Sequence, residues 1–455
     1  TVDSRRLPGT TVLRGVDYLP AEVGDVNALG RNSWAGGTGV LGLYGTVGMQ
    51  LQPVDQTLDA KKSYFLFDNE IVCLGAGITA SDGGSIETTV ENRKLNSTGD
   101  NAFMVDGVEK SSELGYSESL RNVTWAYLEG NAEGSDIGYY FPEGASFNVL
   151  REQRSGCWSD VNQLSNQKDD TVRTNNYLTM YIDHGTTPES AGYSYVLLPG
   201  MSENEVEEYA SSSDITVFAN NEDVQSVRDD TLGVTGANFW NNKETTVYET
   251  VNGKSREYLT VNSKASVMVA EQGGEIEISV SDPTQENGGL IGIELNRSAA
   301  SVVSKDERVT VLQTSPSVVI LVDVSVSNGQ SITITLEAGE AAEPSAEAPE
   351  IISNGRITVR STETVTSPVE ITGTRPISFE LSDSAPEGLT IDRFGMLSID
   401  ADLPAGTYKF QITASNEYGS DTESFTLAKR NSELSAYWSF DEGEGTAFGD
   451  TVNPD

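Results

Sequence analysis

The residues of this sequence that suit acid–base chemistry are few and scattered. The single histidine, His184, lies in Asp183-His184-Gly185, directly after an apolar run. An aspartate beside a histidine suggests a general base with its orienting carboxylate, but neighbouring residues on a strand point to opposite faces. We therefore expect a structural role for His184, as a residue at the end of a strand, and no independent active site.

Metal and phosphate sites usually leave a signature in the sequence, and none is found here. No Cys/His cluster has zinc spacing, and there is no Gly-rich phosphate loop or EF-hand loop. We interpret the acidic pairs Asp169-Asp170 and Asp229-Asp230 as solvated loop charges, with a structural calcium ion held by loop carboxylates and carbonyls as the alternative. We expect no cofactor for chemistry. Cys73 and Cys157 fit either two free thiols or one disulfide.

The composition limits both the size of the fold and its partners. A chain of 455 residues predicts about two to four domains. The formal net charge of −40, from 29 basic and 69 acidic residues, makes nucleic acid and anionic membrane surfaces poor partners. No apolar run reaches the roughly 18 residues that a membrane helix needs, so we expect no membrane insertion. The acidic, Thr/Ser/Gly-rich composition is typical of a secreted bacterial protein.

The stretch from Lys61 to Arg93 gives the clearest strand signals. Two short runs rich in aromatic and β-branched residues, Ser63–Phe67 and Glu70–Leu74, are joined by Asp68-Asn69, which predicts a tight hairpin. After a Gly-rich turn, Ile86–Glu91 predicts another strand. We therefore expect three antiparallel strands in a row.

Two further local signals stand out later in the chain. Ser202 begins a capping-box-like sequence, and Val206 and Tyr209 follow at helical spacing, which predicts one helix. Asn328-Gly329 lies between two alternating runs, the second starting at Ile332, and this is the strongest short hairpin signal available.

Seven short segments of this chain resemble the β-domains of one enzyme family. They are RRLPGTTV (5–12), NSWAGG (32–37), FDNEIVCLGAGI (67–78), ETTVENR (87–93), GCWSDVN (156–162), IDHG (182–185) and YSYVLLP (193–199). Their wording and order are similar to polysaccharide lyase family 8, which includes the hyaluronate, chondroitin AC and xanthan lyases. The resemblance covers roughly the first three-fifths of the chain and is specific for the family rather than for a substrate.

The resemblance implies an all-β fold, and the patterns of the later segments extend it. We expect a central super-β-sandwich at 1–261, a smaller antiparallel β-sandwich at 262–338, a linker at 339–349, an Ig-like or cadherin-like spacer at 350–430, and the start of a laminin-G-like carbohydrate-binding module at 431–455. Few stretches read as helix. The helical (α/α) toroid of the family is therefore expected upstream, outside this chain.

The resemblance also implies a reaction. In the family, a tyrosine on the toroid removes the C5 proton of a uronic acid while Asn and His stabilise the carboxylate, and β-elimination leaves a 4,5-unsaturated uronate. No catalytic residue is then expected in this chain, whose partners would be the toroid and an anionic polysaccharide. Because the chain is itself acidic, the positive binding surface must be local or lie on another segment.

The appended modules favour xanthan, with release of the terminal mannose, over hyaluronan or chondroitin. A non-catalytic carbohydrate-binding or adhesive protein is the alternative of another class.

Two places are candidates for substrate contact. Arg31, Asn32 and Trp34 combine polar groups for sugar hydroxyls or carboxylates with an indole that can stack on a sugar. Trp34 as a core residue is the equal alternative. Some chondroitin-type members carry a functional Glu three positions before this Asn, where this chain has Leu29. Arg228 is similarly placed to the β-domain arginine thought to hold the pyruvate group in xanthan lyases; an ion pair with Asp229 or Asp230 is the alternative.

Overall fold

The computed structural model describes residues 3, 5–15, 32–54, 56–160, 169–341, 346–361 and 364–430. These residues form strands joined by turns, with one α-helix and one short 3-10 helix among them. The expected all-β fold is confirmed. Contacts divide the chain into two units, Thr1–Glu340 and Ala341–Asp455. Over the described ranges, no helix is long and apolar enough to cross a bilayer.

The first unit opens with a 12-stranded sheet, which we call the large sheet. Nine strands follow one another across it: β1 (Thr11–Arg14), β6 (Ser85–Lys94), β11 (Arg173–Asp183), β10 (Ile137–Gly156), β12 (Ala191–Pro199), β5 (Ile71–Thr79), β4 (Asp59–Leu66), β3 (Tyr44–Leu51) and β2 (Ala35–Val40). Three more strands join through β10: β9 (Ser117–Leu128), β7 (Phe103–Val105) and β8 (Val108–Glu109). The 3-10 helix η1 (Trp158–Asp160) follows β10.

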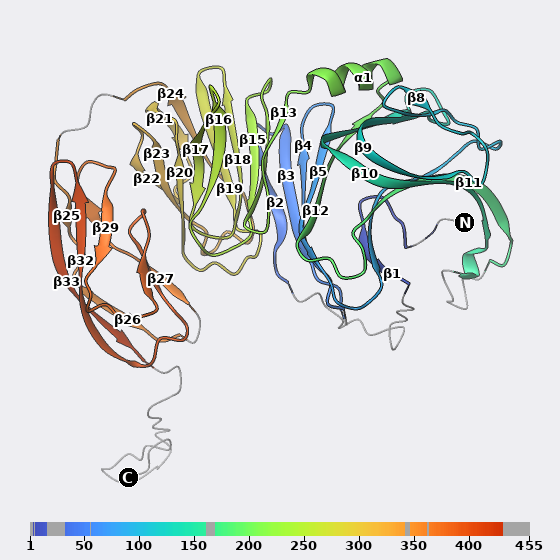
Figure 1. Ribbon diagram of the computed structural model, residues 1–455. Coiled ribbons are helices and arrows are strands. Elements are labelled where there is room, and N and C mark those ends of the chain that lie inside the picture. The colour runs from blue at the N-terminus through green and yellow to red at the C-terminus, as the bar shows by residue number, and fades with distance from the viewer. Residues whose placement is uncertain are drawn as a thin grey trace, which may run out of the picture. The chain divides into compact units, whose positions relative to one another are not determined.

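Two further sheets complete the first unit. The middle sheet has seven strands: β13 (Ile215–Asn220), β14 (Val224–Asp229), β15 (Val234–Phe239), β18 (Ala265–Gln272), β19 (Glu275–Ser281), β24 (Ile332–Ala338) and β21 (Ala299–Lys305). The outer sheet has five: β16 (Thr245–Val251), β17 (Lys254–Val261), β20 (Leu290–Leu295), β23 (Val318–Asp323) and β22 (Val309–Gln313). In Figure 1 the middle sheet lies between the outer sheet and strands β2 to β5 of the large sheet.

Three apolar cores hold these layers together. One fills the inner face of the large sheet and includes Leu58, Phe103 and Tyr139. A second packs the large sheet against the middle sheet and includes Phe65 and Met268. The third lies between the middle and outer sheets. The large and middle sheets are therefore joined by a buried core rather than by a flexible connection.

Glycines allow the large and middle sheets to pack closely, and polar side chains form hydrogen bonds between them. A Cβ atom added at Gly236 would lie 2.6 Å from the ring of Phe65, so only glycine allows this approach. The Ser63 hydroxyl donates to Gln225 at 2.7 Å, and the Asn238 amide donates to Ser63 at 2.9 Å. These buried polar groups satisfy one another across the interface.

The predicted hairpin at Asp68-Asn69 is confirmed, but the predicted row of three strands is wrong. β4 pairs with β5 in antiparallel register, with Tyr64 opposite Cys73. β6, however, is not a neighbour of β5, because β12, β10 and β11 lie between them. The three inserted strands come from residues 137–199, so the local pattern around Ile86 carries no sign of them.

The other two local predictions have different outcomes. The helix is confirmed as α1 (Glu203–Ser212), with a capping box between Ser202 and Glu205 in which the Ser202 backbone N–H donates to the Glu205 carboxylate at 2.7 Å. The Ser202 hydroxyl also donates to this carboxylate at 2.7 Å. Asn328 and Gly329 have the positive φ values of a tight turn, 48° and 75°. The strands that this turn joins, β23 and β24, lie in different sheets, so the predicted hairpin pairing is wrong.

The change from one sandwich to the next lies earlier in the chain than expected. The last strand of the large sheet ends at Pro199, and the middle sheet begins at Ile215. The boundary expected after Val261 falls between β17 and β18, which belong to the two facing sheets of a single sandwich. The sheets therefore place the second sandwich at Ile215–Ala338.

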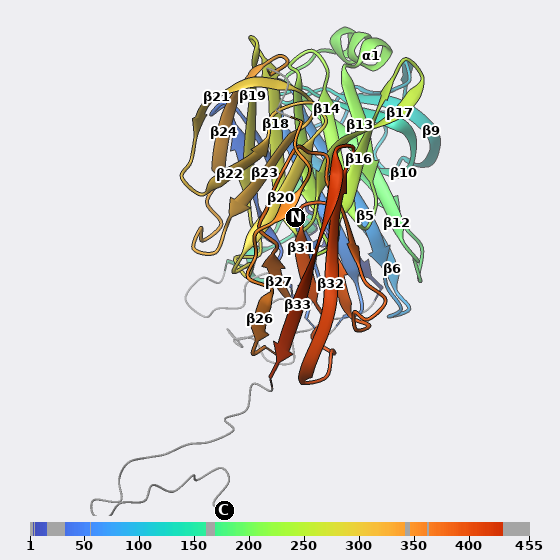
Figure 2. The ribbon, with the colours of Figure 1, turned by 90° about the vertical axis from the view of Figure 1, so that its left-hand side faces the viewer.

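The second unit is a small sandwich with its own core, which includes Leu397 and Ile412. Its sheets are β26 (Arg356–Val359), β33 (Gly419–Lys429), β32 (Gly406–Asn416) and β29 (Ser378–Leu381); β27 (Val365–Pro368), β31 (Met396–Ile399) and β30 (Leu389–Ile391); and β25 (Glu350–Ile351) with β28 (Ile371–Thr372). Figure 2 shows the long β32–β33 hairpin. The Ig-like character of this unit stays a prediction. The module start expected at 431–455 lies outside the described residues.

Candidate functional site

The segment that leads into β1 is fixed to the large sheet by a buried ion pair. The Arg6 guanidinium donates two hydrogen bonds to the Glu87 carboxylate of β6, from Nε to Oε2 at 2.9 Å and from Nη2 to Oε1 at 3.0 Å. The Arg6 guanidinium also lies 4.1 Å from the ring centroid of Tyr181. A two-point contact of this kind fixes both position and orientation.

Polar residues of the ETTVENR segment make the remaining contacts to this lead-in. Asn92 donates to the carbonyl of Arg6 at 2.7 Å, and the hydroxyls of Thr11 and Thr88 lie 2.9 Å apart. All of these side chains are buried. The polar side chains of this strand are therefore satisfied by the backbone and side chains of the lead-in segment rather than by water.

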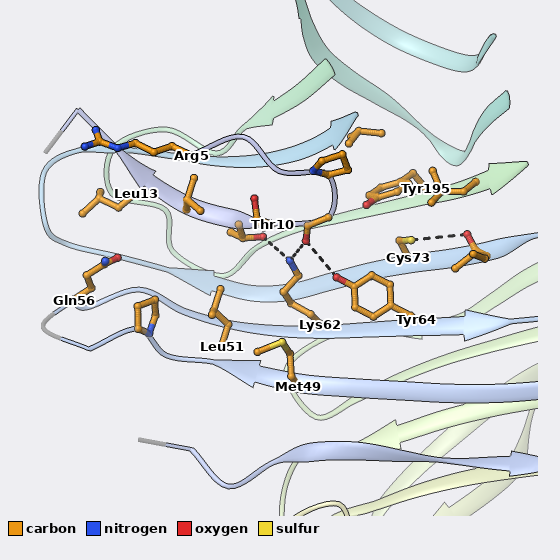
Figure 3. Close-up of a pocket in the computed structure, with 18 residues that line it drawn as sticks. Arg5, Thr10, Leu13, Met49, Leu51, Gln56, Lys62, Tyr64, Cys73 and Tyr195 are labelled. Atoms are coloured by element: carbon orange, nitrogen blue, oxygen red, sulfur yellow. Dashed lines mark hydrogen bonds between the residues drawn. The ribbon is translucent and has the colours of Figure 1, made fainter. Parts of the chain in front are cut away.

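A cavity of about 870 Å³ lies beside this segment (Figure 3). Its walls are mainly apolar side chains of the lead-in and of β1, β3, β5, β6 and β12: Pro8, Val12, Leu13, Met49, Leu51, Pro53, Ile71, Val90 and Leu197. Figure 3 shows Arg5 and Gln56 toward one end of the cavity and Cys73 and Tyr195 toward the other. Arg5 is exposed, whereas Cys73 and Tyr195 are buried, so the cavity has a mouth and a floor.

Lys62 of β4 is the charged side chain on the inner wall of the cavity. It is only 3% exposed, and its amine donates to the carbonyl of Gly9 and, at 3.2 Å, to the hydroxyl of Thr11. Burial lowers the pKa of Lys62 to about 8. Within the described ranges no carboxylate forms an ion pair with this amine.

His184 ends a hydrogen-bond chain that begins at Lys62. The chain runs from the Lys62 amine to Thr11, from Thr11 to Thr88, and from Thr88 to Nε2 of His184 at 2.8 Å. Burial lowers the pKa of His184 to about 4, so the ring is neutral near pH 7. Asp183 accepts from Ser85 and from the backbone of Gly185 instead. This geometry agrees with the structural role expected for His184.

Neither cysteine is in a disulfide. Cys73 is buried on the floor of the cavity, and burial raises the pKa of its thiol to about 12. Such a thiol stays protonated near neutral pH and is a poor nucleophile. Of the two arrangements that the sequence allows, the structure has two free thiols.

The structure describes only part of the loop that we expect to contact substrate. Arg31 lies outside the described residues. Asn32 is partly exposed, and its amide donates to the side chain of Gln52 at 3.2 Å, while Ser33 beside it is exposed. Amide and hydroxyl groups are thus available at the start of β2, and Asn32 stays a candidate for binding sugar hydroxyls.

The structure corrects the stacking role predicted for Trp34. Its side chain is 1% exposed and lies 4.2 Å, centroid to centroid, from Trp240. Its indole Nε1 donates to the carbonyl of Phe239 at 2.9 Å. A ring enclosed in this way offers no face to a sugar, so the core alternative is the one that the structure has.

Arg228 is held by protein carboxylates. Its Nε lies 3.0 Å from Asp230, and its Nη1 lies 2.5 Å from Glu271. Glu271 also binds Arg297, which in turn pairs with Glu249 at 2.8 Å. Because two carboxylates already neutralise this guanidinium, the geometry favours the ion-pair alternative over a site for a substrate pyruvate group.

The acidic pairs point to separate partners. Asp169 lies 3.3 Å from Arg173, and Asp170 accepts from Ser159. Asp229 accepts from the backbone of Leu232, whereas Asp230 pairs with Arg228. In the part of the chain that the structure describes, no group of three or more His, Cys, Asp or Glu side chains is arranged to hold a metal. The structural calcium ion stays an untested alternative.

Comparison with protein families identifies the chain. Residues 1–210 match the super-sandwich domain of polysaccharide lyase family 8, and residues 216–291 match the C-terminal β-sandwich domain of the same family. The chain belongs to polysaccharide lyase family 8. The two matched regions meet between Pro199 and Ile215, where the sheets also change.

Relatives in family 8 act on different polymers. The chain is 43% identical over 342 residues to a xanthan lyase of Bacillus sp. strain GL1, covering 75% of this chain and 35% of that protein. It is 38% identical over 332 residues to a hyaluronate lyase of Thermasporomyces composti, covering 73% and 40%. The chain therefore spans about a third to two-fifths of the length of these relatives.

Solved structures of family 8 members agree with this assignment. Paenibacillus xanthan lyase superimposes with a TM-score of 0.70 at 39% identity, over 91% of this chain and 37% of that one. Streptomyces coelicolor chondroitin AC lyase superimposes with a TM-score of 0.58 at 32% identity, over 74% and 41%.

Sequence reasoning did not select Lys62, which lines the cavity, or Glu87, which fixes the lead-in segment through Arg6. A signal for both was present. Lys62 is a charge inside the strand-like run KKSYFLF, and Glu87 begins a strand rich in polar residues. A charged residue at such a position must be exposed or paired, and both residues are buried with partners.

Proposed function

We propose that this chain is the β-domain portion of a secreted polysaccharide lyase that cleaves a uronate-containing anionic polysaccharide by β-elimination. The observation that carries the proposal is the 43% identity over 342 residues to a xanthan lyase. The match extends through both sandwiches of the first unit, not through one short motif.

The catalytic tyrosine and its partners belong, in this proposal, to a helical toroid outside the present sequence. The described part of the chain supports this division of labour. His184 is half-buried, neutral near pH 7 and hydrogen-bonded to Thr88, and Lys62 is enclosed at 3% exposure. Neither presents a base to a polymer. This chain supplies the rigid β support and one wall of the substrate cleft, where Asn32 and Ser33 offer neutral polar groups.

We favour xanthan as the substrate. The Paenibacillus xanthan lyase structure covers 91% of this chain, whereas two chondroitin lyase structures cover 74% and 73%. The larger coverage is the observation that favours the xanthan lyase. The product would be the terminal mannose, with an unsaturated glucuronate left on the polymer. Hyaluronan is the second candidate because of the 38% identity to a hyaluronate lyase.

Net charge constrains where such a polymer binds. With a net charge of −40, the β-domains repel a polyanion at long range. Neutral amide and hydroxyl groups such as those of Asn32 and Ser33 bind sugar without adding to this repulsion. The cationic contacts are therefore assigned to the toroid.

The test measures the ultraviolet absorbance of unsaturated uronates after incubation with xanthan, hyaluronan and chondroitin sulfate separately. The full-length secreted protein and this chain alone are compared. We expect signal from the full-length protein on xanthan and none from this chain alone. Signal on hyaluronan only would change the substrate, and signal from this chain alone would overturn the placement of the catalytic residues.

The role of Asn32 is tested in the same assay. In the full-length protein, Asn32→Ala should raise KM roughly five- to ten-fold, the loss of about one hydrogen bond, with kcat little changed. Thr187→Ala, at an exposed threonine in the loop between β11 and β12, is the matched control. An unchanged KM in Asn32→Ala would remove this residue from the cleft wall.

A further inference from the structure

The cavity beside the lead-in segment has the size and chemistry of a small-molecule site. Its volume of about 870 Å³ falls in the range of roughly 300–1,000 Å³ found for ligand pockets. Its walls are apolar along most of their length, formed by Leu13, Met49, Leu51, Ile71, Val90 and Leu197. Sugars need many polar partners, so a surface of this kind does not suit the polysaccharide itself.

One charged group lies on the inner wall of this apolar space. Lys62 lines the cavity, is 3% exposed, and has hydrogen bonds to Gly9 and Thr11 that use two of its three N–H donors. The residues in the described ranges provide no carboxylate within ion-pair distance of its amine. A buried ammonium ion without a counter-ion is costly, and an anion in the cavity would relieve that cost.

We propose that the cavity binds an amphiphilic carboxylate, with the carboxylate against Lys62 and the aliphatic body along the apolar walls. The ligand enters between Arg5 and Gln56, which mark the outer end in Figure 3, and reaches inward past Leu51. The hydrogen-bond chain from Lys62 through Thr11 and Thr88 holds the amine in place. The ligand thus meets a preorganised charge at low entropic cost.

The protonation of Lys62 fits this role near neutral pH. Burial lowers the pKa of Lys62 to about 8, so most of the amine is charged at pH 7 and most is neutral at pH 10. Binding of a carboxylate should therefore weaken as pH rises from 7 to 10. Among the neighbouring titratable groups, burial raises the pKa of Tyr64 and Cys73 to about 12 and that of Tyr193 well above its usual value, and lowers that of His184 to about 4, so all four stay neutral from pH 7 to 10.

The experiment is calorimetric titration of this chain with four probes: decanoate, octanoate, decanol and glucuronate. Decanoate and decanol share an aliphatic chain, whereas glucuronate carries the acid without one. We expect decanoate to bind at least about ten-fold more tightly than decanol, from a hydrogen bond to a charged group, and glucuronate not to bind. Octanoate should bind roughly ten-fold more weakly than decanoate, because two methylenes are lost.

Two variants locate the site. Lys62→Met should bind decanoate more weakly than decanol, because the buried carboxylate then has no cation beside it. Lys61→Met is the matched control, because neighbouring residues of β4 point to opposite faces, and it should bind like the unchanged chain. Leu51→Trp fills the cavity and should abolish binding of every aliphatic probe. Thermal unfolding of each variant confirms that it folds.

Several outcomes would overturn the proposal. Absence of decanoate binding refutes the site, and equal affinity for decanoate and decanol refutes the role of Lys62. Binding of glucuronate in place of decanoate would assign the cavity to the polysaccharide. The result is independent of lyase activity, because no polymer cleavage is measured.

Discussion

Glu70 and Asp229 come from different sandwiches of the first unit and meet as a buried, hydrogen-bonded carboxyl pair. Glu70 precedes β5 of the large sheet, and Asp229 ends β14 of the middle sheet. Asp68 and Asp214 add negative charge nearby, and Tyr209 of α1 also faces the pair. Burial and the negative charge of Asp229 both favour the protonated form of Glu70.

The pair should make the first unit less stable as pH rises. Burial, followed by the hydrogen bond and charge of Asp229, raises the pKa of Glu70 to about 8 from 4.5. Folding therefore favours the protonated form. The stabilisation is fully present below pH 4.5 and is lost as pH rises through about 8.

Glu70→Gln keeps a hydrogen bond but cannot titrate. Its unfolding midpoint should change less between pH 5 and pH 8.5 than that of the unchanged chain, and it should be higher at pH 8.5. Differential scanning calorimetry across this range measures the slope. Glu189→Gln, at an exposed position, serves as the control. Equal slopes in Glu70→Gln and the unchanged chain would contradict the raised pKa of Glu70.

Removing only one partner of the Arg6–Glu87 ion pair should destabilise the chain more than replacing both partners with apolar residues. Arg6→Ala leaves the carboxylate of Glu87 buried, with Arg14 3.6 Å away as its remaining cation. We expect a loss of about 3–5 kcal/mol in the free energy of unfolding by urea. The double variant Arg6→Met with Glu87→Met removes both charges and should recover part of this loss. A double variant as unstable as the sum of the single changes would refute the pairing energy.

Trp34 should behave as a core residue. Trp34→Ala removes a fully buried ring and should cost about 3–5 kcal/mol of stability. Trp34→Phe loses the hydrogen bond to Phe239 and should cost less, with no change in the KM of the full-length protein. Urea unfolding and steady-state kinetics are measured on the same variants. A raised KM in Trp34→Phe without a loss of stability would restore the stacking role.

Arg228 should also act on stability rather than on substrate binding. Arg228→Met leaves Glu271 bound to Arg297 at 2.5 Å and Asp230 largely exposed, so we expect a moderate loss of about 1–3 kcal/mol. KM for xanthan should not change in the full-length protein. Arg173→Met, at a side chain that is 69% exposed, is the control and should change neither quantity. A raised KM at unchanged stability would instead support contact with a substrate carboxylate.

Local sequence signals predicted the local structure well. Asp68-Asn69 predicted the β4–β5 hairpin, and Ser202 with its downstream glutamate predicted the start of α1. Asn328-Gly329 predicted a turn with positive φ. In each case the decisive contacts lie within a few residues, so backbone preference and hydrogen bonding are enough to fix the conformation.

Long-range partners could not be predicted in the same way. The strands between β5 and β6 come from residues 137–199, and no pattern near Ile86 specifies them. From the sequence alone, Trp34 fits a sugar-stacking role and a core role equally well. The structure decides between them, because Phe239 and Trp240 contact the Trp34 ring. The same is true of Arg228, whose partner Glu271 is supplied by β18. Burial is decided by strands distant in sequence, and it decides which polar residues are free to bind a ligand.

The joint between the large and middle sheets has a consequence for chimeric enzymes. The two regions that match the family, 1–210 and 216–291, share the core containing Phe65 and Met268 and the contacts of Ser63 with Gln225 and Asn238. Gly236 must stay glycine wherever a ring like that of Phe65 faces it. Exchange of residues 1–210 alone between relatives would pair mismatched surfaces, so Thr1–Glu340 is the shortest interchangeable cassette.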